Sequence, residues 1–112
     1  GNIAKSKVAK LETQAWEAQK KQEETKIDSY IKQKQQEVEQ QQEAISYYNE
    51  YGKKVSEEII KVADSSYKHG EIDFFQYILS LENATTIQVD YLDAVKQYNT
   101  TILDLYYLNI EN

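Results

Sequence analysis

Apolar residues recur along this chain in steps of three and four, the spacing that places side chains on one face of an α-helix. Between residues 27 and 66 the steps alternate and define a heptad seam with polar interruptions. The seam residues are Ile27, Ile31, Lys34, Val38, Gln41, Ile45, Tyr48, Gly52, Val55, Ile59, Val62 and Ser66. A second seam consists of Phe74, Ile78, Leu81, Thr85, Gln88, Leu92, Val95, Asn99, Ile102 and Tyr106. The pattern predicts two long helices.

The stretch SSYKHGEIDFF, residues 65–75, separates the two seams. Gly70 suits the left-handed residue just past a helix end, because it has no Cβ to make that conformation costly. Asp73 and Gln76 have the spacing of a capping box, in which each side chain satisfies the other residue's backbone N–H. The sequence therefore predicts a tight turn between two helices at about residues 68–73.

The two seams match in register if the arms fold back around residue 70. Apolar layers then meet apolar layers, and polar interruptions coincide, which fixes the register of a coiled coil. The expected facing pairs are Val62–Ile78, Ile59–Leu81, Tyr48–Leu92, Ile45–Val95, Val38–Ile102, Gln41–Asn99 and Gly52–Gln88. We expect an all-α fold, a long antiparallel helical hairpin whose first arm is longer than its second.

The start of the first arm follows a different frame. Its apolar stripe does not continue into Ile27, and the polar run KKQEETK lies between the two frames. The stripe consists of Ala4, Val8, Leu11, Ala15 and Ala18. A phase slip within one continuous helix and a break near residues 20–27 both explain the discontinuity.

The second arm is apolar around most of its circumference. Apolar residues outside its seam are Phe75, Leu79, Ile87, Val89, Tyr91, Tyr98, Leu103, Leu105, Tyr107 and Leu108. A helix of this kind is normally covered on several sides, and one partner helix cannot do that. The sequence therefore predicts further helices, from the same parent chain or from other subunits.

Catalytic chemistry lacks its parts in this chain. His69 is the only His among the 112 residues, so triads and His-based metal sites lack their parts. At a helix C-terminus beside Gly70, His69 is best explained by a favourable interaction with the helix dipole. We expect no enzymatic activity, no catalytic, cofactor-binding or metal-binding residues, and no cofactor.

Negative charge is concentrated beyond the turn. Residues 1–70 balance 12 Lys with 12 acidic residues, whereas residues 71–112 carry seven acidic residues and Lys96 alone. The net charge of −6 argues against nucleic acid as a partner. Steps of 11 residues, which keep one narrow helix face, relate Glu71, Glu82, Asp93 and Asp104, and Glu111 follows after seven. This strip is either an ordinary solvated face or the lining of a passage that attracts cations.

The stretch YKHGEIDFFQYILSLENATTIQVDYLDAVKQYNTTILDLYYLN resembles the last helical hairpin of outer-membrane efflux proteins of the TolC type. It is most similar to the heavy-metal branch, which is CusC- and CzcC-like and includes TolC-like segments fused to metal-efflux RND pumps. The residues that carry the resemblance are Tyr67, Gly70, Glu71, Asp73, Tyr77, Leu81, Leu92 and Tyr98. The earlier stretch AKSKVAKLETQAWEAQ is similar to the helix that follows the membrane strands of that family.

The resemblance implies that residues 1–112 are one helical-hairpin fragment of a larger, homotrimeric channel protein. Its location would be the periplasmic portion of an outer-membrane protein, and its function passive transport of metal ions or small molecules. The expected partners are other helices of the channel, a periplasmic adaptor and an inner-membrane RND pump. The implied docking tip consists of Tyr67, Lys68, His69, Gly70, Glu71, Ile72 and Asp73, and the expected lumen-lining residues are Glu82, Asp93 and Asp104. The family often has a basic residue after the tip Gly, where this chain has Glu71.

Two alternatives use the same hairpin differently. The hairpin of a periplasmic adaptor usually ends in an Arg-Leu-Ser type tip, and this chain has no Arg. A stand-alone coiled-coil interaction module is the other alternative. The sequence does not indicate the exported substrate, the oligomeric state of this chain by itself, or whether the parent is a separate channel protein or a pump fusion.

Overall fold

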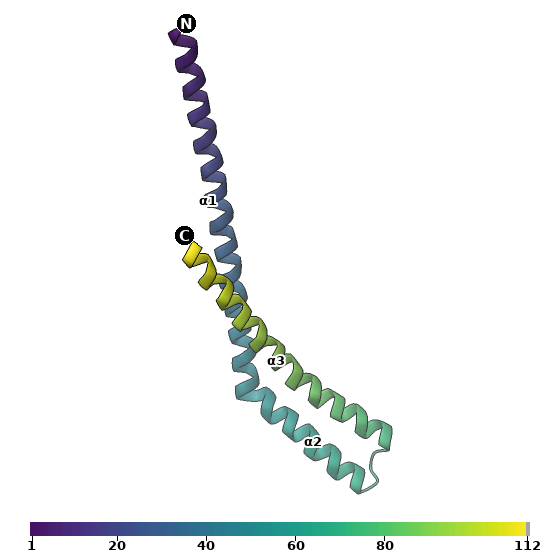
Figure 1. The fold of residues 1–112 in the computed structure, drawn as a ribbon. Helices are drawn as coiled ribbons and strands as arrows, with labels where there is room; N and C mark the ends of the chain where they lie inside the picture. Colours follow the sequence, from purple (N-terminus) through teal and green to yellow (C-terminus); the bar gives the residue numbers. More distant parts are fainter. Residues whose placement is uncertain (112) are drawn as a thin grey trace. The chain divides into compact units, whose positions relative to one another are not determined.

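The computed structural model describes the backbone of residues 1–111 and the side chains of residues 1–108. The elements are α1 (Asn2–Tyr47), a short π-helix η1 (Tyr48–Gly52), α2 (Lys53–Lys68) and α3 (Phe74–Glu111). The first arm comprises α1, η1 and α2, and the second arm is α3, which returns alongside α2 after a turn at residues 69–73 (Figure 1). The predicted all-α helical hairpin, with the longer arm first, is confirmed.

The chain divides into two compact units, Gly1–Gln35 and Gln36–Asn112. The first unit is helical from Asn2 onward and belongs to α1, which runs without interruption to Tyr47. A break near residues 20–27 is therefore excluded, and the change of apolar frame is a phase slip within a continuous helix. The polar run at 20–26 remains helical because Lys, Gln and Glu are strong helix formers and no Pro or Gly interrupts them.

Contacts within the second unit confirm that the arms run antiparallel around the predicted turn. The Ser56 hydroxyl donates to the Ala84 carbonyl at 3.2 Å, and the Tyr77 hydroxyl donates to Asp64 at 2.6 Å. Farther from the turn, the ring of Tyr48 stacks on that of Tyr91 with their centroids 4.1 Å apart. In each pair the two residues lie at nearly equal distances along the chain from residue 70, as the register prediction requires.

The layers that fill the interface differ from the predicted ones. The fully buried side chains there are small, and they belong to Ser56, Ala63, Ala84 and Thr101. Small residues allow the backbones of the two arms to approach closely, so the hairpin is held by a narrow seam with half-buried larger side chains on either side. The expected apolar layers of large residues do not form as a continuous core.

On the first arm, the predicted seam is displaced by one residue beyond Gly52. Val55 is 46% exposed and Val62 is 52% exposed, whereas Ser56 and Ala63 are buried against α3. The π-helix at Tyr48–Gly52 causes this shift, because a π turn closes i→i+5 hydrogen bonds and therefore holds one extra residue. The predicted place of Val62 in the covered seam is thus wrong.

On the second arm, most seam positions beyond Leu81 are displaced. Leu81, Gln88 and Val95 are partly covered as predicted, but Leu92 is 62% exposed and Tyr91 packs in its place. The seam positions that turn out to be exposed are Phe74, Thr85, Leu92, Asn99, Ile102 and Tyr106. For all of these except Phe74, the preceding residue is the covered one: Ala84, Tyr91, Tyr98, Thr101 and Leu105. Heptad spacing allows both sets, and the small Ala84 gives the closer approach of the two arms.

The predicted polar layers also rearrange. Gln41 does not pair with Asn99, which is exposed; instead, the Gln41 side-chain amide donates to the Thr101 hydroxyl at 3.2 Å. The Gln41 Oε1 atom is shielded from solvent and has no hydrogen-bond partner within the described part of the chain. The Gln88 amide donates to the Ser56 hydroxyl at 3.0 Å, so Gln88 spans the interface one turn beyond Gly52.

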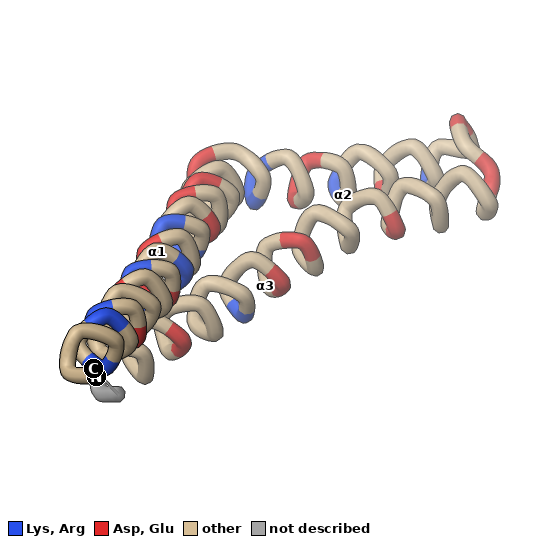
Figure 2. Tube along the Cα trace, turned by 90° about the horizontal axis from the view of Figure 1, so that it is seen from above, with Lys and Arg blue, Asp and Glu red and all other residues tan. Residues whose placement is uncertain are grey.

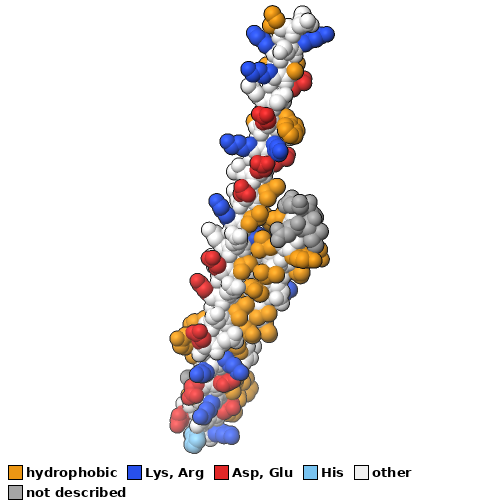
Figure 3. Space-filling view, turned by 90° about the vertical axis from the view of Figure 1, so that its left-hand side faces the viewer, with side chains coloured by type: hydrophobic (Ala, Val, Ile, Leu, Met, Phe, Trp, Pro, Cys, Tyr) orange, Lys and Arg blue, Asp and Glu red, His pale blue; other side chains and the backbone are white. Residues whose placement is uncertain are grey.

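Large apolar side chains remain uncovered on α3. Phe75 is 70% exposed, and Val89, Leu103 and Tyr107 are also exposed. Figure 3 shows hydrophobic side chains gathered on part of this face of the hairpin, whereas charged side chains follow the first arm. The first arm therefore covers only part of the apolar circumference of α3, as the sequence predicts.

Candidate docking tip and acidic face

The tip of the hairpin is closed by backbone hydrogen bonds that cap α2. The N–H of Gly70 donates to the Tyr67 carbonyl at 3.1 Å, and the N–H of Glu71 donates to the Ser66 carbonyl at 2.8 Å. This pair of bonds is the Schellman motif, which satisfies carbonyls that the helix end leaves open. Gly70 has φ +70°, the left-handed conformation that the sequence predicts for it.

The predicted capping box begins α3. The backbone N–H of Gln76 donates to the Asp73 carboxylate at 2.8 Å, and the backbone N–H of Asp73 donates to the Gln76 side-chain oxygen at 3.0 Å. Each side chain satisfies a backbone donor that the first turn of a helix leaves unpaired. The Asp73 carboxylate is thus engaged in the fold itself, although its side chain remains exposed.

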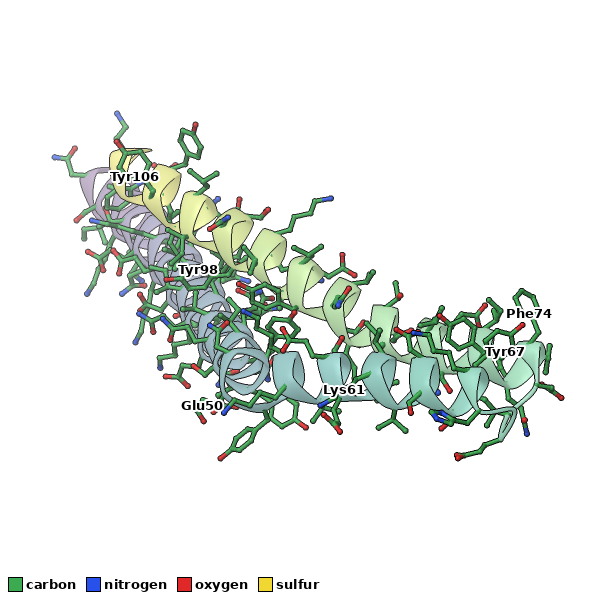
Figure 4. The ribbon with its side chains drawn as sticks, turned by 90° about the horizontal axis from the view of Figure 1, so that it is seen from below. Glu50, Lys61, Tyr67, Phe74, Tyr98 and Tyr106 are labelled. Carbon is green, nitrogen blue, oxygen red and sulfur yellow. The ribbon has the colours of Figure 1, made fainter. Side chains whose placement is uncertain are left out.

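Three aromatic rings gather just behind the turn. The ring of Tyr67 stacks on that of Tyr77, with the ring centroids 4.9 Å apart. Tyr67 also makes an edge-type contact with Phe74, with the ring centroids 6.2 Å apart. Figure 4 shows Tyr67 and Phe74 close together at the closed end of the hairpin. Such contacts between aromatic rings stabilise the end of the hairpin beyond the effect of area burial alone. Phe74 itself is 62% exposed, so an apolar surface remains open next to the turn.

A hydrogen bond between the arms fastens this aromatic cluster. The Tyr77 hydroxyl donates to Asp64 at 2.6 Å, and the bond to the carboxylate raises the pKa of Tyr77 above its ordinary value. The cause is that a phenolate beside a carboxylate loses the hydrogen bond and gains repulsion. The sequence reasoning did not single out Asp64, although the register around residue 70 places it opposite Tyr77.

The raised pKa of Tyr77 predicts how the tip responds to alkaline pH. The hydrogen bond contributes stability that is fully present below the ordinary tyrosine pKa of about 10 and is lost as pH rises through the higher pKa of the folded state. NMR titration of carbon-labelled tyrosines should show Tyr77 ionising at a pH above the ordinary tyrosine pKa of about 10. The Asp64→Asn variant should bring the Tyr77 pKa down toward the ordinary tyrosine value, because it removes the carboxylate that raises it. An unchanged Tyr77 pKa would contradict the assignment.

The remaining tip residues form an exposed, charged rim. Lys68, His69 and Glu71 are exposed, whereas Ile72 is half-buried. The His69 Nδ1 atom lies 2.7 Å from the Ser65 carbonyl, to which it can only donate, and the same carbonyl also accepts the backbone N–H of His69 at 3.0 Å. This contact agrees with the predicted role of His69 at the helix end. Of the seven predicted tip residues, Tyr67 and Lys68 are the last residues of α2, and residues 69–73 form the turn.

The acidic residues of α3 do not converge into a cluster. Glu82 and Asp93 are exposed on the face of α3 turned away from the first arm, and Asp104 is half-buried. The side chain of Glu111 lies outside the described residues. Figure 2 shows the acidic positions spread along α3, where Lys96 is the only basic residue. An extended strip of this kind creates a negative potential along the helix and holds no single ion.

The described residues include no group of three or more His, Cys, Asp or Glu side chains arranged to hold a metal ion. In the same part of the chain, none of the helices has the length and hydropathy of a membrane span. Comparison with known protein families, curated proteins and solved structures finds no match to this chain.

Proposed function

We propose that this chain is a periplasmic wall segment of the channel component of a tripartite efflux system. In this proposal the hairpin forms part of the wall of an α-helical barrel in an outer-membrane protein. It takes part in transport as a passive conduit and catalyses no reaction. The resemblance of residues 67–109 to the last hairpin of TolC-type proteins gives the proposal its specific content.

The observation that carries the proposal is the uncovered apolar surface of a hairpin that is already paired. Phe75, Val89 and Leu103 are exposed on α3 although the two arms are in contact. On the first arm, Val55 and Val62 are also open to solvent. Exposed apolar residues on both arms are typical of a helix pair that packs between other helices, as in the wall of a barrel.

The acidic strip indicates which face of the wall segment would line the interior of the channel. A helix packed between neighbours still presents one face to the interior of the barrel. We assign that face to Glu82, Asp93 and Asp104, because carboxylates along a narrow aqueous passage raise the local concentration of cations. The expected substrates are therefore metal ions or small cationic molecules.

Charge reversal tests this assignment in the full-length parent protein. The triple variant Glu82→Lys, Asp93→Lys and Asp104→Lys should lower cation export several-fold, with a larger loss at low ionic strength. The matched control reverses Glu39, Glu43 and Glu57, which are exposed acids of the first arm. Export should be measured as metal efflux from cells that contain equal amounts of each variant. Equal export by the two triple variants would reject the lumen assignment.

The turn is the part of the chain that we assign to docking. A photo-crosslinking amino acid at His69 should capture an adaptor or pump protein from the cell envelope, whereas the same amino acid at the exposed Lys32 should not. Capture by Lys32 and not by His69 would favour a stand-alone interaction module over the channel, since contacts would then lie along the first arm.

A further inference from the structure

The π-helix η1 divides the first arm into two differently phased helices. The Lys53 N–H donates to the Tyr48 carbonyl, an i→i+5 bond that accommodates one more residue than an α-helical turn. Residues that pack on α3 follow the heptad frame up to Gly52 and continue one residue later, at Ser56 and Ala63. The first arm changes direction at this point (Figure 1), as helices do at π-bulges.

The sequence still carries the frame that the π-helix interrupts. Val55, Ile59, Val62 and Ser66 continue the seam of α1 in unbroken heptad spacing. In the structure this set does not pack on α3 as a seam but lines an open groove on the side of the hairpin. The opposite wall of the groove includes Ser80, at the edge of α3. The chain thus encodes two contact faces on α2, and only one is in use.

The two faces offer different contacts to the same part of α3. In the observed state, Ser56 donates to the Ala84 carbonyl and accepts a hydrogen bond from Gln88. If η1 became regular α-helix, α2 would turn by about 100°, one residue's rotation. Val55 would then occupy the place of Ser56, and Val62 that of Ala63. That state would lose the Ser56 hydrogen bonds and would move the arms apart at the Ala84 layer, and in return it would cover β-branched side chains that are now exposed.

Gly52 lies at the point where such a conversion would begin. It is buried where the π turn meets α3, and a Cβ added there would lie 3.1 Å from the Tyr48 ring and 3.4 Å from the Ile87 side chain. The Tyr48 ring is held in place by its stacking on Tyr91. Gly52 has the helical dihedrals φ −59° and ψ −39° in the observed state, so the space around its Cα, and not its helix propensity, distinguishes the two states. Figure 4 shows Glu50 of the π turn on the side away from α3.

We infer that η1 is a two-state joint. Its conversion to α-helix rotates α2 against α3 and exchanges the small contact face, Ser56 and Ala63, for the β-branched face, Val55, Ile59 and Val62. The same conversion removes the groove along the hairpin, because the residues that line it move into the seam. The inference rests on the geometry of residues 36–108 and does not depend on the proposed function.

Disulfide trapping tests the joint, because the full chain contains no Cys. The pair Ser56→Cys and Ala84→Cys reports the observed state, and the pair Val55→Cys and Ala84→Cys reports the rotated state. Under mild oxidation, both disulfides should form, the first one faster. Gly52→Ala should speed formation of the 55–84 disulfide relative to that of the 56–84 disulfide, because the added Cβ would lie 3.1 Å from the Tyr48 ring in the observed state.

Deletion of one residue from the π turn provides the matched control. Removal of the exposed Asn49 converts η1 to regular α-helix while it keeps Ser56 and Ala63 in phase with α3. In this background the 56–84 disulfide should form as before, and the 55–84 disulfide should be at least tenfold slower than in the undeleted chain. If the 56–84 disulfide fails to form, deletion of Glu50 takes the place of this control.

The inference is overturned by either of two results. Formation of the 55–84 disulfide at the same rate with and without Asn49 would show that general flexibility of the hairpin, and no rotation of α2, brings these residues together. Failure of Gly52→Ala to change the relative rates of the two disulfides would show that the π turn does not control the contact face.

Discussion

The Ala84→Leu variant should be the most destabilised single substitution in the arm interface. Ala84 is completely buried, and its carbonyl accepts the Ser56 hydroxyl at 3.2 Å, so the two backbones are close at this layer. A leucine side chain has no space there and forces the arms apart. Overpacking of this kind costs roughly 1–3 kcal/mol, and we expect a value at the upper end because a backbone-level contact cannot yield locally. Urea unfolding followed by helical circular dichroism measures the loss.

Thr85→Leu is the matched control for this substitution. Thr85 belongs to the heptad seam read from the sequence, but in the structure it is exposed. The same leucine at this position should therefore change the free energy of unfolding by no more than about 0.5 kcal/mol. A larger loss for Thr85→Leu than for Ala84→Leu would show that the sequence frame, and not the observed one, packs against the first arm.

The contrast between these neighbours shows how far heptad spacing predicts a helical hairpin. The spacing correctly gives the number of arms, their antiparallel register and the place of the turn. It does not choose between Ala84 and Thr85, because positions three and four residues after Leu81 both lie on the seam side of the helix. Which of the two residues faces the first arm depends on how closely the two backbones approach. The sequence of a helix that is apolar over most of its circumference does not predict that distance.

The π-helix is the feature that sequence patterns could not locate. The heptad frame passes through Tyr48–Gly52 without interruption, so the spacing predicts a regular helix there. The one local sign is Gly52 itself, which is unfavourable inside a helix and is tolerated where a Cβ would clash. The discontinuity that the sequence does show, near residues 20–27, has no structural counterpart in α1 because a solvated helix needs no continuous apolar seam.

The tip was predictable because local interactions determine it. Gly70, Asp73 and Gln76 form their cap motifs from residues at most five positions apart, so turn chemistry alone specifies them. By contrast, the bond between Asp64 and Tyr77 crosses the interface and requires the register in addition. The residues of the acidic strip are exposed or half-buried, and whether they face a lumen depends on neighbouring helices, which the charge-reversal experiment addresses.

Gly70→Val tests whether the turn depends on backbone conformation alone. Gly70 has φ +70°, and no atom lies within 4 Å of a Cβ built at this position. The cost of a side chain is therefore the cost of the left-handed conformation, about 1–2 kcal/mol for an ordinary residue and more for a β-branched one. We expect Gly70→Val to lose about 2 kcal/mol of unfolding free energy, measured by thermal or urea unfolding of the full chain.

Gly70→Asn separates this explanation from a loss of space. Asparagine also adds a side chain at this position, but it visits the left-handed conformation more readily than most other residues with a side chain. The Gly70→Asn variant should therefore lose less than half as much unfolding free energy as Gly70→Val. Equal losses for valine and asparagine would mean that crowding at the tip, and not φ, requires glycine. Because the Schellman bonds of Gly70 and Glu71 end α2, a smaller loss for asparagine would also show that this cap is retained when only the conformational preference changes.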